Sequence, residues 1–248
     1  MTLLSVNVNK IALVRNSRDI GQPSVVEAAR TCLQAGAHGI TVHPRPDQRH
    51  IRPGDVTDLV ALLRGGRAEF NIEGNPFAGS EGSYPGFMEI VRRARPAQAT
   101  LVPDDPGQLT SDHGFNMARD AARLKPLIAD LQSLGVRVSV FMDPDVDQIA
   151  RVPDCGADRI ELYTEPYARA CEQGRSGPSL QQFARAAQRA ADLGLGVNAG
   201  HDLNLENLGA FIEQVPNVLE VSIGHAIICD ALRLGLAPAV KTYLKLVT

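Results

Sequence analysis

The chain has 248 residues, of which 44% are hydrophobic, and a formal net charge of −3 at neutral pH. This length supports one substantial hydrophobic core, and the slightly acidic balance argues against a general nucleic-acid-binding protein, which normally carries a basic surface. No apolar run approaches the roughly 20 residues that cross a bilayer, and the start MTLLSVNVNK lacks the basic segment of a secretory signal peptide.

Eight short β-rich runs alternate with segments of helical periodicity along the chain. The predicted strands are 3–9, 39–43, 69–73, 99–103, 136–143, 158–163, 195–200 and 219–224. Each is bounded by Gly, Pro or polar residues, as strand ends often are. The predicted helices are 23–35, 55–63, 87–95, 115–134, 146–152, 180–193 and 226–246, the first of which starts at a proline and stops at Gly36.

Eight strand–helix units in about 250 residues are the size of a (β/α)8 TIM barrel. We therefore predict one TIM-barrel domain, with additional helices, over residues 1–248. The alternative is an open doubly wound sheet, but no G-x-G-x-x-G motif follows the first strand. The longest segment between strands, 104–135, has room for an extra helix or a lid loop.

Polar residues gather where the predicted strands end, which is where TIM barrels carry their chemistry. Four of the six histidines are in this set, and His43, Glu73 and His201 follow three different strands. Histidine titrates near neutral pH, and a glutamate in a closed pocket can be raised toward that range. The pattern predicts a general acid–base site.

Arginines near the same strand ends indicate an anion rather than a metal ion. Arg45 and Arg49 lie between His43 and His50, where guanidinium groups oppose a second cation and favour phosphate. The last predicted helix opens at Gly224-His225, and the exposed N–H groups of a helix start bind anions. Two separate anion sites would suit phosphorylated small-molecule substrates, and we expect no bound metal.

The four cysteines are widely separated and form no C-x-x-C pair: Cys32, Cys155, Cys171 and Cys229. Such spacing is typical of reduced thiols rather than of a disulfide framework or a zinc site. We therefore expect a cytoplasmic protein that binds neither membranes nor nucleic acid.

Six motifs, taken together and in this order, resemble the pyridoxine 5'-phosphate synthase family, which acts in the deoxyxylulose-dependent route to vitamin B6. They are SVNVNKIALVRNSR, GITVHPRPDQRHI, FNIEGNP, RIELYTEPYA, NAGHDLNL and SIGHAII. The resemblance implies a TIM barrel that forms a homo-octamer, a tetramer of dimers. It also implies a transferase that condenses 3-amino-2-oxopropyl phosphate with 1-deoxy-D-xylulose 5-phosphate. The products are pyridoxine 5'-phosphate, phosphate and water, and no cofactor is needed.

The resemblance also implies roles for single residues. His43 and Glu73 match the proton acceptors, His201 matches the proton donor, and Glu161 matches the residue that stabilises the transition state. The residues that match groups holding the aminoketone phosphate are Asn7, Arg18, Gly224 and His225. Those that match contacts to the deoxyxylulose phosphate are Arg45, His50 and Thr110.

The chain departs from the family's pattern at two places in its substrate-binding groups. Asn9-Lys10 stands where Asp-His is typical, and Asp202 stands where a glycine usually follows the donor histidine. The departures bear on substrate preference. We expect Asp202 to point away from the phosphate and to cap a helix that begins near Asn204.

Two other functions stay open. A TIM-barrel isomerase or aldolase acting on another sugar phosphate would need a strand-end lysine for a Schiff base, and Lys10 is the candidate. A non-catalytic relative would only bind a phosphorylated ligand, which the filled positions His43, Glu73 and His201 disfavour.

Overall fold

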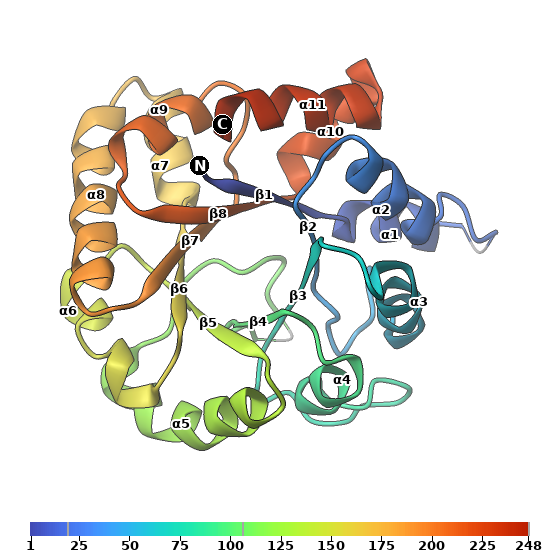
Figure 1. Ribbon diagram of the computed structural model, residues 1–248, viewed down its shortest axis with the longest axis horizontal. Coiled ribbons are helices and arrows are strands. Elements are labelled where there is room, and N and C mark those ends of the chain that lie inside the picture. Colours follow the sequence, from blue (N-terminus) through green and yellow to red (C-terminus); the bar gives the residue numbers. More distant parts are fainter. Residues whose placement is uncertain (19, 106, 248) are drawn as a thin grey trace.

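Eight parallel strands close into a barrel in chain order (Figure 1). The computed structural model describes residues 1–18, 20–105 and 107–247. The strands are β1 (Leu3–Asn7), β2 (Gly39–Val42), β3 (Glu69–Gly74), β4 (Gln98–Leu101), β5 (Arg137–Met142), β6 (Arg159–Tyr163), β7 (Gly196–Gly200) and β8 (Val218–Ile223). All eight predicted strands are confirmed, and so is the predicted barrel; the open-sheet alternative is wrong.

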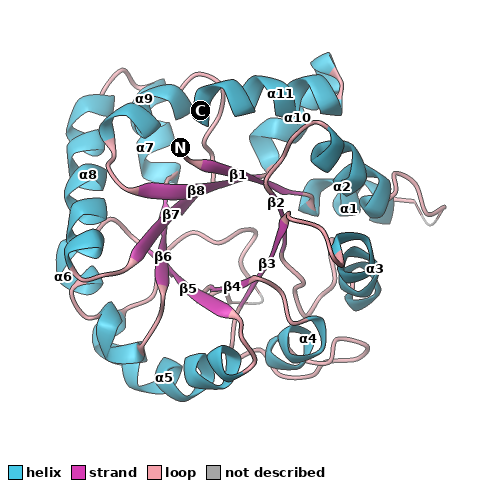
Figure 2. Ribbon diagram, viewed as in Figure 1, coloured by secondary structure: helices cyan, strands magenta, loops and turns pink. Residues whose placement is uncertain are grey.

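A ring of helices covers the outside of the barrel (Figure 2). They are α1 (Asn9–Asn16), α2 (Val25–Gln34), α3 (Pro53–Leu63), α4 (Phe87–Ala94), α5 (Met117–Ser133), α6 (Val146–Ile149), α7 (Glu165–Glu172), α8 (Ser176–Asp192), α9 (Leu208–Gln214), α10 (His225–Leu234) and α11 (Leu236–Val247). None of these helices is long and apolar enough to cross a membrane.

The helices differ from the prediction in three short elements and in two breaks. The sequence did not predict α1 or α7, which have eight residues each, and α9 begins at Leu208 rather than near Asn204. The expected helix 226–246 is divided into α10 and α11 at Gly235, whose φ of +84° is a left-handed conformation that stops a helix. The expected helix 146–152 shrinks to α6, followed by a short 3-10 turn, Val152–Cys155.

Apolar and polar residues alternate along the strands, and this alternation separates two layers. In β1, for example, Leu4 and Val6 belong to the hydrophobic core, whereas the Ser5 hydroxyl bonds to the Thr41 hydroxyl of β2 at 2.7 Å. The same interior chain of bonds continues around the barrel through Asn71 of β3. The apolar layer lies between strands and helices, and the inside of the barrel is a polar lumen.

Charged side chains close the amino-terminal end of this lumen. Arg137 forms an ion pair with Glu69 and donates a hydrogen bond to the Gln98 side chain at 2.9 Å. Arg159 donates to Asn198 at 3.0 Å. Because these groups satisfy one another at the base, the open end of the lumen is the carboxyl end of the strands.

Candidate active site

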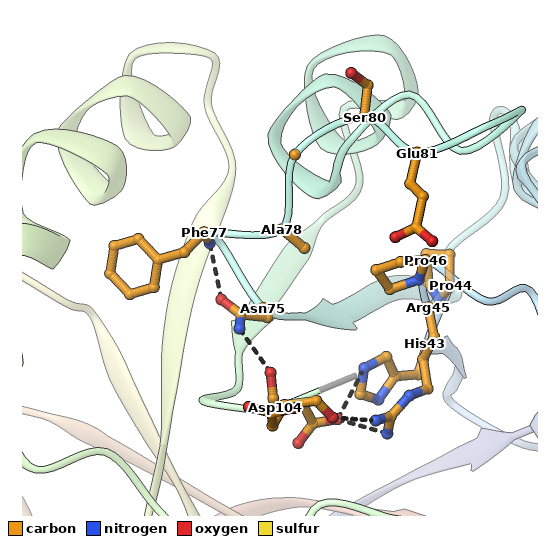
Figure 3. A pocket seen from close by; sticks show the side chains of 12 residues that line it. His43, Pro44, Arg45, Pro46, Asn75, Phe77, Ala78, Ser80, Glu81 and Asp104 are labelled. Atoms are coloured by element: carbon orange, nitrogen blue, oxygen red, sulfur yellow. Dashed lines mark hydrogen bonds and ion pairs between the residues drawn. The ribbon is translucent and has the colours of Figure 1, made fainter. Parts of the chain in front are cut away.

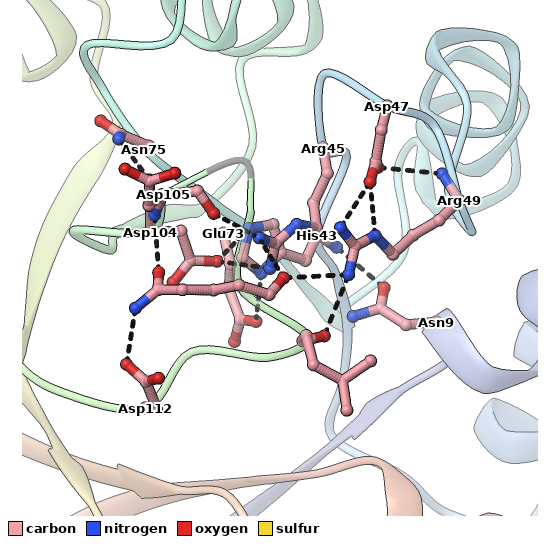
Figure 4. Close-up of polar contacts among 12 residues, drawn as sticks. Asn9, His43, Arg45, Asp47, Arg49, Glu73, Asn75, Asp104, Asp105 and Asp112 are labelled. Atoms are coloured by element: carbon pink, nitrogen blue, oxygen red, sulfur yellow. Dashed lines mark hydrogen bonds and ion pairs between the residues drawn. The ribbon is translucent and has the colours of Figure 1, made fainter.

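His43 is the first residue after β2, and it is buried at the mouth of the barrel (Figure 4). Its backbone N–H donates to the side-chain oxygen of Asn9 at 2.9 Å, which fixes the start of the segment after β2. On the two sides of its ring, Nδ1 lies 3.9 Å from Oε2 of Glu73, and Nε2 lies 3.4 Å from Oδ2 of Asp104. The imidazole therefore stands between two carboxyl groups.

Glu73 lies in β3 with only 3% of its surface exposed. Asn7 donates a long hydrogen bond, 3.5 Å, to its Oε2. Within the described residues its other oxygen, Oε1, is buried and has no hydrogen-bond partner. A buried polar atom is normally paired, so an unpaired carboxyl oxygen beside a histidine is typical of a group that acts on a ligand.

Burial raises the pKa of Glu73 well above its ordinary value, and the charges of Glu161 and Asp104 raise it further. Burial likewise raises the pKa of Glu161 to about 8, with Glu220 adding to the rise and a Thr100 hydrogen bond opposing it. Glu161 lies directly against the backbone of Gly200, where a β-carbon would collide with its carboxyl. The lumen thus holds carboxyl groups that are protonated at neutral pH.

The imidazoles at the mouth are held neutral. Burial, followed by the charge of Arg45, lowers the pKa of His43 to about 3. The contact with Asp104 would favour an imidazolium, but that carboxylate is already paired with Arg45. Burial also lowers the pKa of His50 to about 3 and that of His201 to about 4.

His201 enters the mouth from the end of β7. Its ring packs against Phe141 and Tyr163, with ring centroids 4.9 Å and 5.7 Å away. Its backbone adopts a left-handed φ of +74°, and the Thr164 hydroxyl donates to both the Gly200 and the His201 carbonyl oxygens. His201 lies near enough to His43 for its charge to lower the pKa of that residue.

The two arginines of the segment after β2 bind the segment after β4. Arg45 pairs with Asp104 at 2.8 Å and donates to the carbonyl oxygens of Asp105 and Gln108 at 3.0 Å and 3.1 Å. Arg49 donates to the carbonyl oxygens of residues 108 and 109. Thr110 follows them and is exposed. The buried guanidinium of Arg45 therefore joins the segments that follow β2 and β4.

Helix α1 supports the segment after β2 from below. The Asn16 amide donates to the carbonyl oxygens of Gln48, Arg49 and His50 at 3.3, 3.1 and 2.8 Å. His50 is buried, its Nδ1 accepts the N–H of residue 51, and its ring stands at 62° to that of His43. This contact leaves the proton of a neutral His50 on Nε2.

Gly224 and His225 form the start of α10, as the sequence predicts. A β-carbon at Gly224 would lie 3.1 Å from Cβ of Asn7, so a larger residue here would press on Asn7. His225 is exposed, and its Nε2 lies 3.5 Å from Sγ of Cys229. The start of α10 therefore lies beside Asn7, which is another residue of the predicted aminoketone site.

The expected helix cap at Asp202 is wrong. Helix α9 begins at Leu208, and no side chain caps it. Asn204 and Asn207 fill the turn before the helix with reciprocal hydrogen bonds. Asp202 instead has a left-handed φ of +57° and is exposed, near the charges of His225 and Lys10. The carboxylate thus faces cations at the mouth.

Arg18, another predicted site residue, is exposed and follows the end of α1. The sequence, in turn, assigned no role to Asp104, although this residue directly follows a predicted strand. Its signal was its position in LVPDD, two residues beyond the predicted strand's last apolar residue.

A cavity of about 310 Å³ opens beside His43, between the segments that follow β2, β3 and β4 (Figure 3). Arg45, Asn75 and Asp104 are among its lining residues, and Figure 3 shows Asp104 in contact with both His43 and Arg45. Over residues 1–18, 20–105 and 107–247, no three His, Cys, Asp or Glu side chains are arranged to hold a metal ion. The expectation of metal-free chemistry stays a prediction.

Comparison with known protein families gives a match over residues 4–248 to the family described as pyridoxal phosphate biosynthesis protein PdxJ. A pyridoxine 5'-phosphate synthase of Xanthomonas campestris pv. campestris (strain B100) is 61% identical over 246 residues, which are 99% of this chain and 96% of the relative. The pyridoxine 5'-phosphate synthase of Xylella fastidiosa (strain 9a5c) is 57% identical over 98% of this chain and 94% of its own length.

Solved structures with low sequence identity share the fold. A phosphoribosyl anthranilate isomerase of Thermotoga maritima matches all of this chain and 98% of its own, with a TM-score of 0.61 and 14% identity. A 3-keto-L-gulonate-6-phosphate decarboxylase of Vibrio cholerae matches 99% of this chain and 97% of its own, with a TM-score of 0.64 and 10% identity. At these identities the likeness supports the barrel alone.

Proposed function

The chain belongs to the PdxJ family of pyridoxal phosphate biosynthesis proteins, and on this premise we propose how its barrel mouth carries out the family's reaction. It is an enzyme, a pyridoxine 5'-phosphate synthase like its relatives at about 60% identity. The reaction that we propose joins 3-amino-2-oxopropyl phosphate to 1-deoxy-D-xylulose 5-phosphate. It releases pyridoxine 5'-phosphate, phosphate and water.

The buried titratable groups supply the proton transfers. Joining an amine to a ketone, losing water and closing an aromatic ring need repeated transfers, and each well-placed group contributes about 10²–10⁴-fold. His43, with a pKa of about 3, is neutral and ready to accept a proton. Glu73 has a raised pKa, so it gives up a stored proton before it accepts one from the substrate.

His201 donates a proton from the opposite side of the mouth. Its pKa of about 4 leaves it neutral in the free enzyme, so it takes up a proton during the reaction before it donates one. The charge of Asp104 already raises the pKa of His201, and a bound phosphate would act in the same direction. Glu161, with a pKa of about 8, stabilises developing negative charge as a protonated donor.

The aminoketone phosphate binds at the start of α10. There the backbone N–H groups at Gly224 and His225 belong to the first turn of the helix, beside Asn7, and a helix N-terminus favours an anion. Arg18 is the remaining member of this predicted set. It is exposed and follows the end of α1, and its role stays a prediction.

The deoxyxylulose phosphate binds beside β2. Arg45 and His50 are buried there, and Arg45 can exchange its carbonyl partners for phosphate oxygens. Thr110 contributes its hydroxyl from the segment after β4. Asn9 and Lys10 contact the deoxyxylulose phosphate, and Asp202 lies beside a phosphate site; at these three positions this chain differs from the family's usual residues.

The observation that carries the proposal is the meeting of His43 with Glu73, 3.9 Å apart, at a mouth that also holds His201. Purified enzyme given the two substrates in metal-free buffer is expected to form pyridoxine 5'-phosphate, measured by chromatography with fluorescence detection. Absence of product from protein that is folded by circular dichroism would contradict both the activity and the metal-free mechanism.

Lys10 allows an aldolase mechanism to be tested separately. It lies near the start of α1, and its charge acts on His50, His201 and Asp202 at the mouth. A Schiff-base mechanism would let borohydride trap substrate on Lys10. Synthase activity without such trapping is the expected result.

The proposal also covers the oligomeric state of the enzyme, its single domain and its location in the cell. Family membership supports a homo-octamer, a tetramer of dimers, in which each chain acts as one domain over residues 1–248. The widely spaced cysteines support a cytoplasmic enzyme. The mass of the assembly in analytical ultracentrifugation tests the first of these points.

A further inference from the structure

Asp104 follows β4 and contacts both His43 of the acid–base site and Arg45 of the substrate site. Its carboxylate is 6% exposed, and one oxygen, Oδ2, lies 3.4 Å from Nε2 of His43 and 2.8 Å from Nη1 of Arg45. Its own carbonyl accepts a hydrogen bond from the Asn75 amide at 2.7 Å, which anchors its backbone. Figure 3 shows the three side chains in contact.

We propose that Asp104 is a positioning residue that holds the proton of neutral His43 on Nε2 and so leaves Nδ1 as the proton acceptor facing Glu73. The inference rests on the proposed role of His43 in the synthase reaction. It goes beyond that role because it decides which ring nitrogen reacts and which residue imposes the choice.

The surroundings of both ring nitrogens lead to the same tautomer. A neutral imidazole has one N–H, and the nitrogen that faces a carboxylate keeps it. Asp104 is paired with Arg45 at 2.8 Å, the geometry of an ionised carboxylate, and offers an acceptor at Nε2. Oε2 of Glu73 is 3.9 Å from Nδ1, too far to accept a hydrogen bond that would hold the proton on that nitrogen. The other charges that act on His43 are those of His201, Arg49 and Asp47.

The distance of 3.4 Å between Nε2 of His43 and Oδ2 of Asp104 is longer than that of a strong hydrogen bond. Catalytic hydrogen bonds are often long in the free enzyme and shorten when substrate is bound. Asn9 already fixes the backbone of His43 at 2.9 Å, so closure needs only a small rotation of the ring or of the carboxylate. Because Arg45 holds the same oxygen, its response to a bound phosphate would adjust the position of the catalytic histidine.

The test compares Asp104→Asn, which keeps the shape but removes the charge, with Asp112→Asn as a matched control. Asp112 is an exposed carboxylate of the same segment that contacts Gln108 and His113. We expect Asp104→Asn to lower kcat by about tenfold or more, as loss of an orienting partner typically does. The KM for the aminoketone should change by less than about threefold. Asp112→Asn should retain wild-type kcat.

Neutron diffraction from wild-type crystals provides a readout that depends neither on activity nor on the folding of a variant. The expected result is a hydrogen on Nε2 of His43 and none on Nδ1. A hydrogen on Nδ1, or an Asp104→Asn enzyme with wild-type kcat, would overturn the proposal. If the wild-type enzyme showed no synthase activity, the proposed function would be refuted instead. The neutron result would still decide which nitrogen of His43 carries the proton.

Discussion

Among the site residues, Glu73 has the environment that most directly indicates a catalytic role. Burial keeps its carboxyl protonated, while one oxygen contacts His43 and Asn7 and the other lacks a partner within the described chain. A purely structural carboxyl would have both oxygens satisfied. The unpaired oxygen is therefore available to a ligand.

Glu73→Gln is expected to lower turnover by at least about tenfold while substrate binding persists, because the amide keeps the shape but cannot transfer a proton. Steady-state kinetics with both substrates, together with calorimetric binding of the aminoketone phosphate, check this. The exposed Glu213 of α9 offers a control as Glu213→Gln, which should behave as wild type. Unchanged turnover in Glu73→Gln would remove Glu73 from the mechanism.

At the scale of elements, α1 determines how the segment after β2 is held. Asn16 donates to three consecutive carbonyl oxygens, and neighbouring Arg15 pairs with Asp55 of α3 and donates to the His50 carbonyl. These residues do not contact substrate themselves, but they hold the segment that positions Arg45 and His50. A short helix that the sequence did not predict therefore supports the deoxyxylulose phosphate site.

Asn16→Leu removes these donors and is expected to raise the KM for the deoxyxylulose substrate by about tenfold, with a smaller effect on kcat. Loss of buried carbonyl partners should also lower the free energy of unfolding by about 1–3 kcal/mol. Kinetics and thermal unfolding measure the two effects. The neighbouring Ser17→Ala variant serves as the control, since the exposed Ser17 hydroxyl donates to the Val14 carbonyl oxygen. An unaltered KM in Asn16→Leu would disconnect α1 from the site.

The sequence predicted the strands and the residues at their ends better than it predicted the segments between them. His43, Glu73 and His201 were identifiable because each lies at or just after the end of a β-rich run, and strand ends meet at one rim. Helix α1 was not, because it begins two residues after β1 with no polar linker between them. The pairing of Arg45 with Asp104 was also out of reach, since it joins segments 59 residues apart that have no regular structure.

For the molecule as a whole, buried titratable groups make stability depend on pH in two opposing ways. Folding raises the pKa of Glu161 from 4.5 to about 8 and that of Glu220 to about 7, so unfolding releases protons over this range. Stability therefore falls as pH rises from about 4.5 to 8. Folding lowers the pKa of His43 and His201 from 6.5 to about 3 and 4, so stability also falls as pH drops below 6.5.

Only the carboxyl effect remains above pH 6.5, and one such group costs about 1.4 kcal/mol per pH unit. The free energy of unfolding is expected to be lower at pH 8 than at pH 6.5 by about 2 kcal/mol from Glu161 alone. Glu161→Gln should remove that part of the slope and leave stability at pH 6.5 nearly unchanged. Denaturant titrations at equal protein concentration measure both variants. An identical slope in wild type and Glu161→Gln would show that Glu161 does not carry the effect.

The polar lumen has a consequence for how this barrel would respond to selection. Replacing buried polar groups with apolar ones of similar volume is often neutral or stabilising, and here such groups fill the space where other barrels pack valine and leucine. Laboratory evolution for thermal tolerance alone is therefore expected to replace Ser5, Thr41 and Asn71 with apolar residues, and the hydrogen bonds that join these side chains inside the barrel would be lost.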